Sequence, residues 1–251
     1  MPKILLIGGS DGSCGAGLFA DFETLHELNS SASVVVTSVT SQNDQRFDES
    51  LIIPSKNIKS QLDVISSNTC QVVKVGMLPN VEAVMAVSEY FSTDMSSKVI
   101  VDPVLSSSSG GVLSSHATLD AMKQLLFPLV DLITPNLSEA RLILGLEENH
   151  QIELTQLAQD CLQWSSKAVL LKGGHLEGDT CIDVFVEKEN LDDPIVLKRK
   201  KLNGGTSIRG TGCRLASAIA HFYGSGSDLR ESVMAGTNYL QSYLKEKLKE
   251  N

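Results

Sequence analysis

Short apolar runs alternate with segments of helical spacing along most of this chain, and this alternation limits the fold more than any other feature. Each run is too short for a helix and is typical of a strand buried on both faces of a parallel sheet. We expect strands over residues 3–7, 33–39, 71–75, 99–101, 129–133 and 169–171, with helices near 18–28, 55–66, 80–91 and 115–126. The pattern predicts an α/β fold with a mostly parallel sheet and helices on both faces.

The rest of the chain adds a predicted hairpin and two more helices. The runs 180–186 and 194–198 flank a turn-rich segment and predict an antiparallel excursion. A helix is expected after residue 210, and a last one from residue 228. No internal repeat or low-complexity linker is present in the 251-residue sequence. We therefore expect one domain over residues 1–251.

Charge and cysteine usage exclude several classes of protein. The 30 acidic residues outnumber the 21 basic ones, and the net charge of −9 argues against a nucleic-acid or membrane partner. The short basic run 198–201 is expected to be a solvated face. No apolar run approaches the roughly 18 residues of a membrane span. Five cysteines without metal-ligand spacing argue against disulfides and zinc, so we expect a cytoplasmic protein with reduced thiols.

Polar or glycine-rich clusters follow nearly every predicted strand. The carboxyl ends of parallel strands meet at one edge of a sheet, where open α/β proteins bind ligands. The clusters occupy residues 8–17, 40–43, 76–79, 102–103, 134–139 and 172–175. We expect them to lie together around one site.

The sequence Gly210-Thr211-Gly212-Cys213 directly precedes a segment of helical spacing. A helix that begins after such a turn presents free backbone N–H groups and partial positive charge, which suits a phosphate. A helix N-terminus can also lower the pKa of a thiol, so Cys213 is expected to ionise readily. A plain helix start with a small buried cysteine is the alternative.

The other clusters contain side chains suited to phosphoryl transfer, which needs a metal held by carboxylates and a positive group on the phosphates. Asp102 and Glu139 are suited to hold Mg²⁺, and Lys172 to neutralise developing charge. The alternatives are a turn aspartate, a solvated lysine, and a capping box formed by Asn136 and Glu139. The sequence has no G-x-x-x-x-G-K-[ST] loop, so a nucleotide would be held by another scaffold.

Together these motifs resemble the ribokinase superfamily, and within it the hydroxymethylpyrimidine and phosphomethylpyrimidine kinases of thiamine biosynthesis. They come in the family's order over nearly the full length of the chain. The motifs are Gly9-Ser10-Asp11, Gly15-Ala16-Gly17, Ala20-Asp21, Thr40-Ser41-Gln42-Asn43, Val73-Lys74-Val75-Gly76-Met77-Leu78, Val101-Asp102-Pro103-Val104, Thr134-Pro135-Asn136, Glu139-Ala140, Lys172-Gly173-Gly174-His175-Leu176 and Gly210-Thr211-Gly212-Cys213.

The resemblance implies a ribokinase-like, three-layer α/β/α sandwich that forms a homodimer. It implies transfer of the ATP γ-phosphoryl group, with Mg²⁺, to 4-amino-5-hydroxymethyl-2-methylpyrimidine, to its monophosphate, or to both. The pyrimidine site would be lined by six residues: Ala16, Asp21, Thr40, Gln42, Met77 and Val104. Gln42 and Asp21 would bind the ring, and an amide suits this because it offers both a donor and an acceptor.

The resemblance also implies roles on the phosphate side of the site. Asp102 and Glu139 would serve the metal, and Asn136, Lys172 and Thr211 would bind ATP. The catalytic turn would be Gly210, Thr211, Gly212 and Cys213, with the cysteine in the place of the aspartate base of the sugar kinases.

Three residues and one loop depart from the family's pattern. Cys14 stands where glycine is usual, Gly12 where proline is often found, and Arg209 where a histidine is common. The loop 106–111 lacks the usual lysine and acidic residue. Arg209 is expected to supply the missing positive charge beside the phosphates. Two alternatives stay open: a pyridoxal or pyridoxine kinase, and a non-catalytic ligand-binding protein.

Overall fold

The computed structural model describes residues 1–65, 70–93, 97–105, 113–147, 150–165, 167–174, 179–202, 204–205 and 208–250. In these residues the strands form one nine-stranded sheet of order β3-β2-β1-β4-β5-β6-β7-β8-β9. The strands are β1 (Lys3–Asp11), β2 (Ser31–Gln42), β3 (Phe47–Ile52), β4 (Val72–Val75), β5 (Lys98–Val101), β6 (Leu132–Ile133), β7 (Ala168–Leu171), β8 (Thr180–Glu187) and β9 (Ile195–Lys200). The helices are α1 (Gly17–Glu27), α2 (Ser55–Val64), α3 (Val81–Thr93), α4 (His116–Ala121), α5 (Leu137–Leu144), α6 (Leu154–Cys161), α7 (Thr211–Gly224) and α8 (Leu229–Glu250).

The middle of the sheet is parallel, as the sequence predicts. Neighbouring strands from β2 through β1, β4, β5 and β6 to β7 run in the same direction. β3 pairs antiparallel with β2 at one edge, and β8 and β9 form the predicted antiparallel hairpin at the other.

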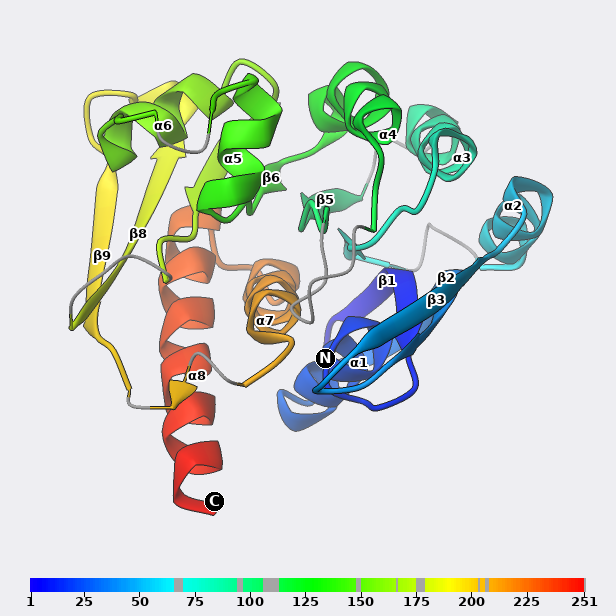
Figure 1. Cartoon of the computed structure of the whole chain (residues 1–251), viewed down its shortest axis with the longest axis horizontal. Helices are drawn as coiled ribbons and strands as arrows, with labels where there is room; N and C mark the ends of the chain where they lie inside the picture. The colour runs from blue at the N-terminus through cyan, green and yellow to red at the C-terminus, as the bar shows by residue number, and fades with distance from the viewer. Residues whose placement is uncertain are drawn as a thin grey trace.

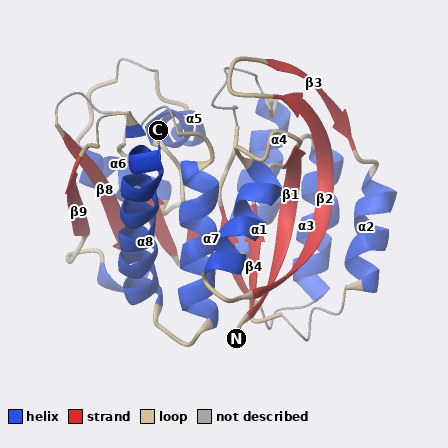
Figure 2. Ribbon diagram, turned by 90° about the horizontal axis from the view of Figure 1, so that it is seen from below, coloured by secondary structure: helices blue, strands red, loops and turns tan. Residues whose placement is uncertain are grey.

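Two apolar layers cover the sheet, because successive side chains of a strand point to opposite faces. Leu5 and Ile7 of β1 pack with helices α2 to α6, whereas Ile4 and Leu6 pack with α1, α7 and α8. Figure 2 shows the latter three helices in front of the sheet, and Figure 1 shows α7 between α1 and α8. The three-layer α/β/α arrangement is therefore confirmed.

Some expected elements differ from those observed. The expected helix 115–126 is divided into α4 and a π-helical turn, Met122–Leu126, and the expected strand 129–133 is reduced to β6. A 3₁₀ turn, Phe127–Leu129, intervenes because Pro128 has no N–H to donate to a ladder. β3 and α6 were not expected. The serine-rich segment 106–111, expected to be a loop, lies outside the described residues.

Within the described ranges, no helix combines the length and apolar character needed to cross a membrane. The carboxyl ends of the parallel strands meet the start of α1 and the start of α7, and this meeting point contains the site described next.

Candidate active site

One cavity of about 280 Å³ lies at the carboxyl edge of the sheet. All fifteen site residues expected from the sequence line it, although they come from segments spread over the whole chain. They are Ala16, Asp21, Thr40, Gln42, Met77, Asp102, Val104, Asn136, Glu139, Lys172, Arg209, Gly210, Thr211, Gly212 and Cys213. The predicted convergence of strand ends is thus observed, while the role of each residue stays a prediction.

The 210–213 turn begins α7 in a conformation that requires glycine. Gly210 has φ of 68°, and a Cβ there would stand 2.4 Å from the carbonyl oxygen of Gly15. Gly17, the first residue of α1, has φ of 61° and similarly tight surroundings. Neither helix start has a side-chain cap, and both helix starts, whose first N–H groups have no partner within the helix, border the cavity. This arrangement suits an anionic group.

Asp102 and Lys172 form an ion pair beside this turn. Lys172 Nζ lies 2.6 Å from Asp102 Oδ1, which also accepts a hydrogen bond from the hydroxyl of Thr134. Burial opposes ionisation of Asp102, but Lys172 and Lys74 outweigh it and hold the pKa of Asp102 below its ordinary value. A Cβ on Gly212 would stand 3.0 Å from Lys172 Nζ and 3.4 Å from Asp102 Oδ2. The absent side chain therefore gives a ligand access to both charges.

Asn136 and Glu139 form the capping box that the sequence offers as the alternative to a metal role. Asn136 Oδ1 accepts the N–H of Glu139 at 2.9 Å, and Glu139 Oε2 accepts the N–H of Asn136 at 2.8 Å. Both residues also line the cavity, so the cap positions them there. Burial raises the pKa of Glu139 to about 7; Lys172 opposes this shift and Asp102 adds to it.

The carboxylates of Asp102 and Glu139 fit a magnesium ion that keeps most of its water ligands. Among the described residues no group of three or more potential protein ligands is assembled. Mg²⁺ commonly needs only one or two carboxylates together with water and phosphate oxygens. Asp102 and Glu139 are both buried at the cavity wall, and their charges influence each other.

Cys213 lies in the first turn of α7, but its thiol is not readily ionised. Burial raises the pKa of Cys213 to about 11, whereas Lys74 and the N–H of Gly17 act to lower it. Asp21 and Asp102 add to the upward shift. The expectation of a thiol with a near-neutral pKa is therefore wrong, because removal from water outweighs the helix N-terminus.

Lys74 is a site residue that the sequence analysis did not assign. Its side chain is 1% exposed, and its ammonium group lies 2.9 and 2.8 Å from the two carboxylate oxygens of Asp21. Ser217 of α7 donates to the same carboxylate at 2.8 Å. Burial alone would lower the pKa of Lys74, but the negative charges of Asp21, Cys213 and Asp102 together outweigh burial and raise the pKa above its ordinary value. A single lysine within the otherwise apolar strand β4 is the sequence signal for this pair.

Asp21 thus has a structural role in addition to its expected role at the ring, and the latter stays a prediction. Burial raises the pKa of Asp21, and the contacts with Lys74 and Ser217 oppose that shift. The carboxylate lines the cavity while joining α1 to β4 and α7.

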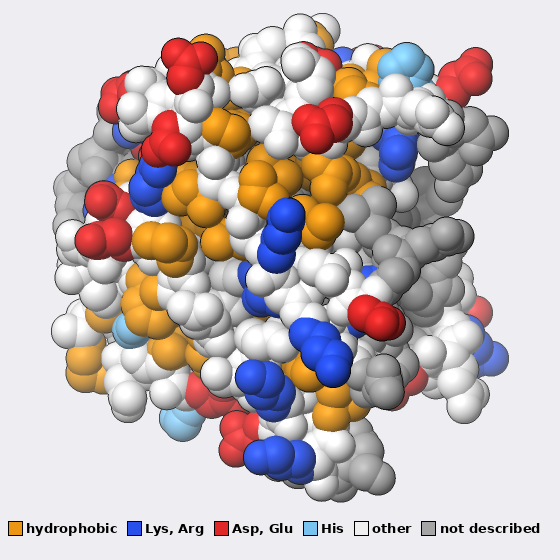
Figure 3. Space-filling model, turned by 90° about the vertical axis from the view of Figure 1, so that its left-hand side faces the viewer, with side chains coloured by type: hydrophobic (Ala, Val, Ile, Leu, Met, Phe, Trp, Pro, Cys, Tyr) orange, Lys and Arg blue, Asp and Glu red, His pale blue; other side chains and the backbone are white. Residues whose placement is uncertain are grey.

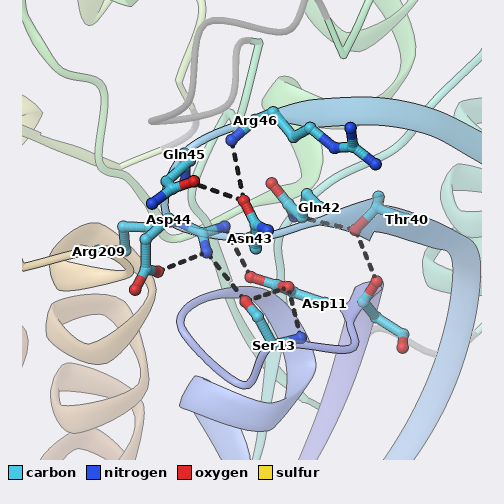
Figure 4. A network of polar contacts seen from close by, with 10 residues as sticks. Asp11, Ser13, Thr40, Gln42, Asn43, Asp44, Gln45, Arg46 and Arg209 are labelled. Atoms are coloured by element: carbon cyan, nitrogen blue, oxygen red, sulfur yellow. Dashed lines mark hydrogen bonds and ion pairs between the residues drawn. The ribbon is translucent and has the colours of Figure 1, made fainter.

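Thr40 and Gln42 lie on the same side of β2 and face the cavity (Figure 4). Gln42 Nε2 donates to Thr40 Oγ1 at 2.9 Å, and the Thr40 hydroxyl donates to the Ser10 carbonyl at 2.9 Å. Met77 and Val104 add apolar surface to the same cavity. The expected pyrimidine pocket thus combines an amide with apolar walls, which is typical of sites for small rings.

Arg209 closes the cavity beside this pocket. Its guanidinium pairs with Asp11 at 2.8 Å and with Asp44 at 3.1 Å, and it donates to the Ser13 hydroxyl at 2.9 Å (Figure 4). Asp11 is buried, whereas the side chain of Asp44 is 83% exposed. Arg209 therefore ties the start of α7 to the β1–α1 loop and to the β2–β3 connection.

The basic run 198–201 is only partly the solvated face that was expected. Arg199, Lys200 and Lys201 line the cavity, and Arg199 is ion-paired with the buried Asp183 of β8. Figure 3 shows Lys and Arg side chains gathered on the lower half of the face at the β9 edge of the sheet. The strand alternation of β9 could have suggested that Arg199 faces inward, but it does not account for Lys200 and Lys201, which line the cavity at the end of the strand.

Solved structures of related kinases share this fold, and two of them serve for comparison. The phosphomethylpyrimidine kinase of Clostridium difficile 630 matches with a TM-score of 0.82 and 29% identity, covering 97% of this chain and 100% of that one. The Staphylococcus aureus pyridoxal kinase in complex with pyridoxal matches with a TM-score of 0.86 and 26% identity, covering 98% of this chain and 88% of that one. Fold and cavity together define a ribokinase-like small-molecule kinase.

The sequence comparisons narrow this class. A family model described as phosphomethylpyrimidine kinase matches residues 11–251, and the chain belongs to this family. The hydroxymethylpyrimidine/phosphomethylpyrimidine kinase of Aquifex aeolicus is 33% identical over 246 residues, covering 98% of this chain and 95% of that protein. A probable thiamine biosynthetic bifunctional enzyme of rice is 34% identical, and the chain spans 44% of its length.

Proposed function

We propose that this protein transfers the γ-phosphoryl group of ATP to 4-amino-5-hydroxymethyl-2-methylpyrimidine, to its monophosphate, or to both, in thiamine biosynthesis. The observation that carries the proposal is the convergence, in one cavity, of the Gln42 amide, the 210–213 turn and the Asp102–Lys172 pair. The first suits a small heterocycle and the other two suit transferring phosphate oxygens.

Each part of the cavity has a role in this proposal. The N–H groups at the start of α7 bind the transferring phosphoryl group, and Lys172 balances its charge. Asp102 and Glu139 hold Mg²⁺, which neutralises phosphate charge when bound. Cys213 accepts the proton of the substrate hydroxyl, and its raised pKa means that the reactive thiolate is a minor species at neutral pH.

We propose a cytoplasmic homodimer, with no nucleic-acid or membrane partner. The edge ribbon formed by β2 and β3 supports the dimer. Val39 and Leu51 are paired across the ribbon and are 43% and 67% exposed, and the neighbouring Ile52 is 41% exposed. An exposed apolar strand edge is a surface that a second copy would cover. Equilibrium sedimentation of the wild type and of Leu51→Lys tests this: a dimer that the substitution weakens is expected.

A parallel assay of three substrates tests the activity. The protein is incubated with magnesium ATP and either the pyrimidine alcohol, the pyrimidine monophosphate or pyridoxal, and each product is identified by mass. Phosphorylation of one or both pyrimidines is expected. Phosphorylation of pyridoxal alone would show that the likeness to the S. aureus pyridoxal kinase is the better guide. No turnover with any alcohol would indicate a ligand-binding protein.

A further inference from the structure

The hydroxyl group of Thr40 connects the backbone of β1 to the side chain of Gln42. Thr40 is paired with Asp11 across the β1–β2 ladder, and its Oγ1 lies 2.9 Å from the carbonyl oxygen of Ser10. Gln42 follows two residues later on the same face of β2, and its Nε2 lies 2.9 Å from the same Oγ1 (Figure 4). Thr40 Oγ1 therefore stands between a backbone carbonyl and an amide.

The chemistry of these groups fixes the direction of both hydrogen bonds. A carbonyl oxygen can only accept, so the single hydroxyl hydrogen of Thr40 is directed at Ser10. Toward Gln42, Thr40 Oγ1 can then only accept. The NH₂ half of the Gln42 amide must face Thr40, because the reversed amide would place two acceptors against each other.

The remaining half of the amide is its carbonyl oxygen. Gln42 Oε1 is buried and has no hydrogen-bond partner among the described residues, although Gln42 lines the cavity. A buried acceptor without a donor has lost its water partners and gained nothing in return, which carries a free-energy cost. An occupant that brings an N–H or O–H donor to this point would remove that cost.

We propose that Thr40 is a positioning residue that holds Gln42 as a fixed acceptor, so that the cavity selects rings with an exocyclic amine. This inference rests on the proposed function and deepens it. The amine of an aminopyrimidine donates to Gln42 Oε1. A ring with a carbonyl or phenolate oxygen at the same place presents an acceptor to an acceptor and is rejected.

Calorimetric binding of two probes tests this without phosphoryl transfer. The first probe is the aminopyrimidine in which a methyl group replaces the hydroxymethyl group, and the second has a carbonyl oxygen in place of its amine. The wild type is expected to bind the amine at least about tenfold more tightly, which corresponds to one hydrogen bond of about 1.4 kcal/mol.

Three variants separate positioning from packing. Thr40→Ser retains the hydroxyl and is expected to keep the preference for the amine. Thr40→Val keeps the shape but frees the amide, and is expected to lower the preference about tenfold. Thr24→Val removes a buried threonine hydroxyl, bonded to Ala20, away from the cavity and is expected to change nothing. Thermal unfolding of each variant establishes that it is folded.

The inference is overturned if Thr40→Val keeps the preference, or if Thr40→Ser loses as much as Thr40→Val. Its failure differs from failure of the proposed function. Turnover of pyrimidines with a Thr40-independent preference would remove the inference alone. A Thr40-dependent preference without turnover of any pyrimidine would support the inference and remove the proposed kinase activity.

Discussion

Glu139 is a buried carboxylate whose protonation changes near neutral pH. Burial raises its pKa to about 7 from an ordinary value of 4.5. Between pH 4.5 and about pH 7, Glu139 is protonated in the folded chain but ionised in the unfolded chain. Its contribution to the free energy of unfolding is therefore complete below pH 4.5 and is lost as the pH rises through about 7. Metal binding requires the opposite, ionised form.

Glu139→Gln tests both consequences because glutamine can retain the capping box. Relative to the wild type, the variant is expected to gain stability between about pH 5 and about pH 8, as it no longer has a proton to lose. It is expected to require more magnesium for half-maximal activity. Thermal unfolding at both pH values and a magnesium titration measure these effects. If the difference in melting temperature between the variant and the wild type were the same at both pH values, the raised pKa of Glu139 would be contradicted.

The proposed role of Cys213 as the base leads to a prediction about the dependence of kcat on pH. If its thiolate accepts the substrate proton, kcat rises from neutral toward alkaline pH, because the thiolate fraction increases up to the raised pKa of about 11. Cys213→Ala is expected to lower kcat by roughly 10²–10⁴-fold and to abolish this rise, with the Kd for the pyrimidine unchanged. Cys161→Ala, which removes a thiol buried in the core, is the matched control. If kcat rose equally with pH in Cys213→Ala and Cys161→Ala, Cys213 would be excluded as the base.

Arg209→Ala is expected to raise the KM for ATP or for a phosphorylated substrate, since a positive group beside the 210–213 turn is lost. It also leaves the buried carboxylate of Asp11 without its partner, which costs about 3–5 kcal/mol of stability. Arg46→Ala removes an exposed pair with Asp48 and serves as the control. Steady-state kinetics with each substrate measure the effect, and unchanged KM values would assign Arg209 to structure alone.

At the scale of elements, the loop between β1 and α1 contains one strained residue. Cys14 has φ of 60°, a left-handed conformation that favours glycine, and this accounts physically for the family's usual residue at that position. Cys14→Gly is expected to relieve about 1–2 kcal/mol of strain and to give part of it back through the freer unfolded chain. Denaturant unfolding should show a net gain below about 1 kcal/mol. A loss of stability would contradict this account.

Most elements that the sequence predicted have a clear apolar pattern; α6 has one too, at Leu154, Leu157, Ala158 and Cys161, and could have been predicted from it. β1 and β7 are buried on both faces, which gives continuous apolar runs. β3 is a mostly exposed edge strand, so its composition carries no such signal. In the site, glycines and charged residues at the strand ends were enough to predict which residues line the cavity. The Lys74–Asp21 ion pair could not be predicted in this way, because it depends on how α1 packs against β4.

At the scale of the whole molecule, the Lys74–Asp21–Ser217 contacts join β4, α1 and α7 beneath the cavity. Lys74→Met leaves Asp21 buried without a counter-charge and is expected to cost about 3–5 kcal/mol. The matched control is Lys59→Met, which removes an exposed pair with Glu89 and should cost less than about 1 kcal/mol. Urea unfolding measures the free energy of unfolding of both variants. Equal losses would contradict the claim that the buried pair contributes more than the exposed one.

The backbone contact between Gly15 and Gly210 also has a consequence for the order of events during synthesis. The two glycines lie at opposite ends of the sequence, yet each helix start helps to form the cavity wall. A nascent chain can fold its first strands and α1 while α7 is still untranslated. Until α7 emerges, the N–H groups of α1 have no second helix beside them. The nascent protein therefore acquires the turn that we propose to bind phosphate only near the end of translation.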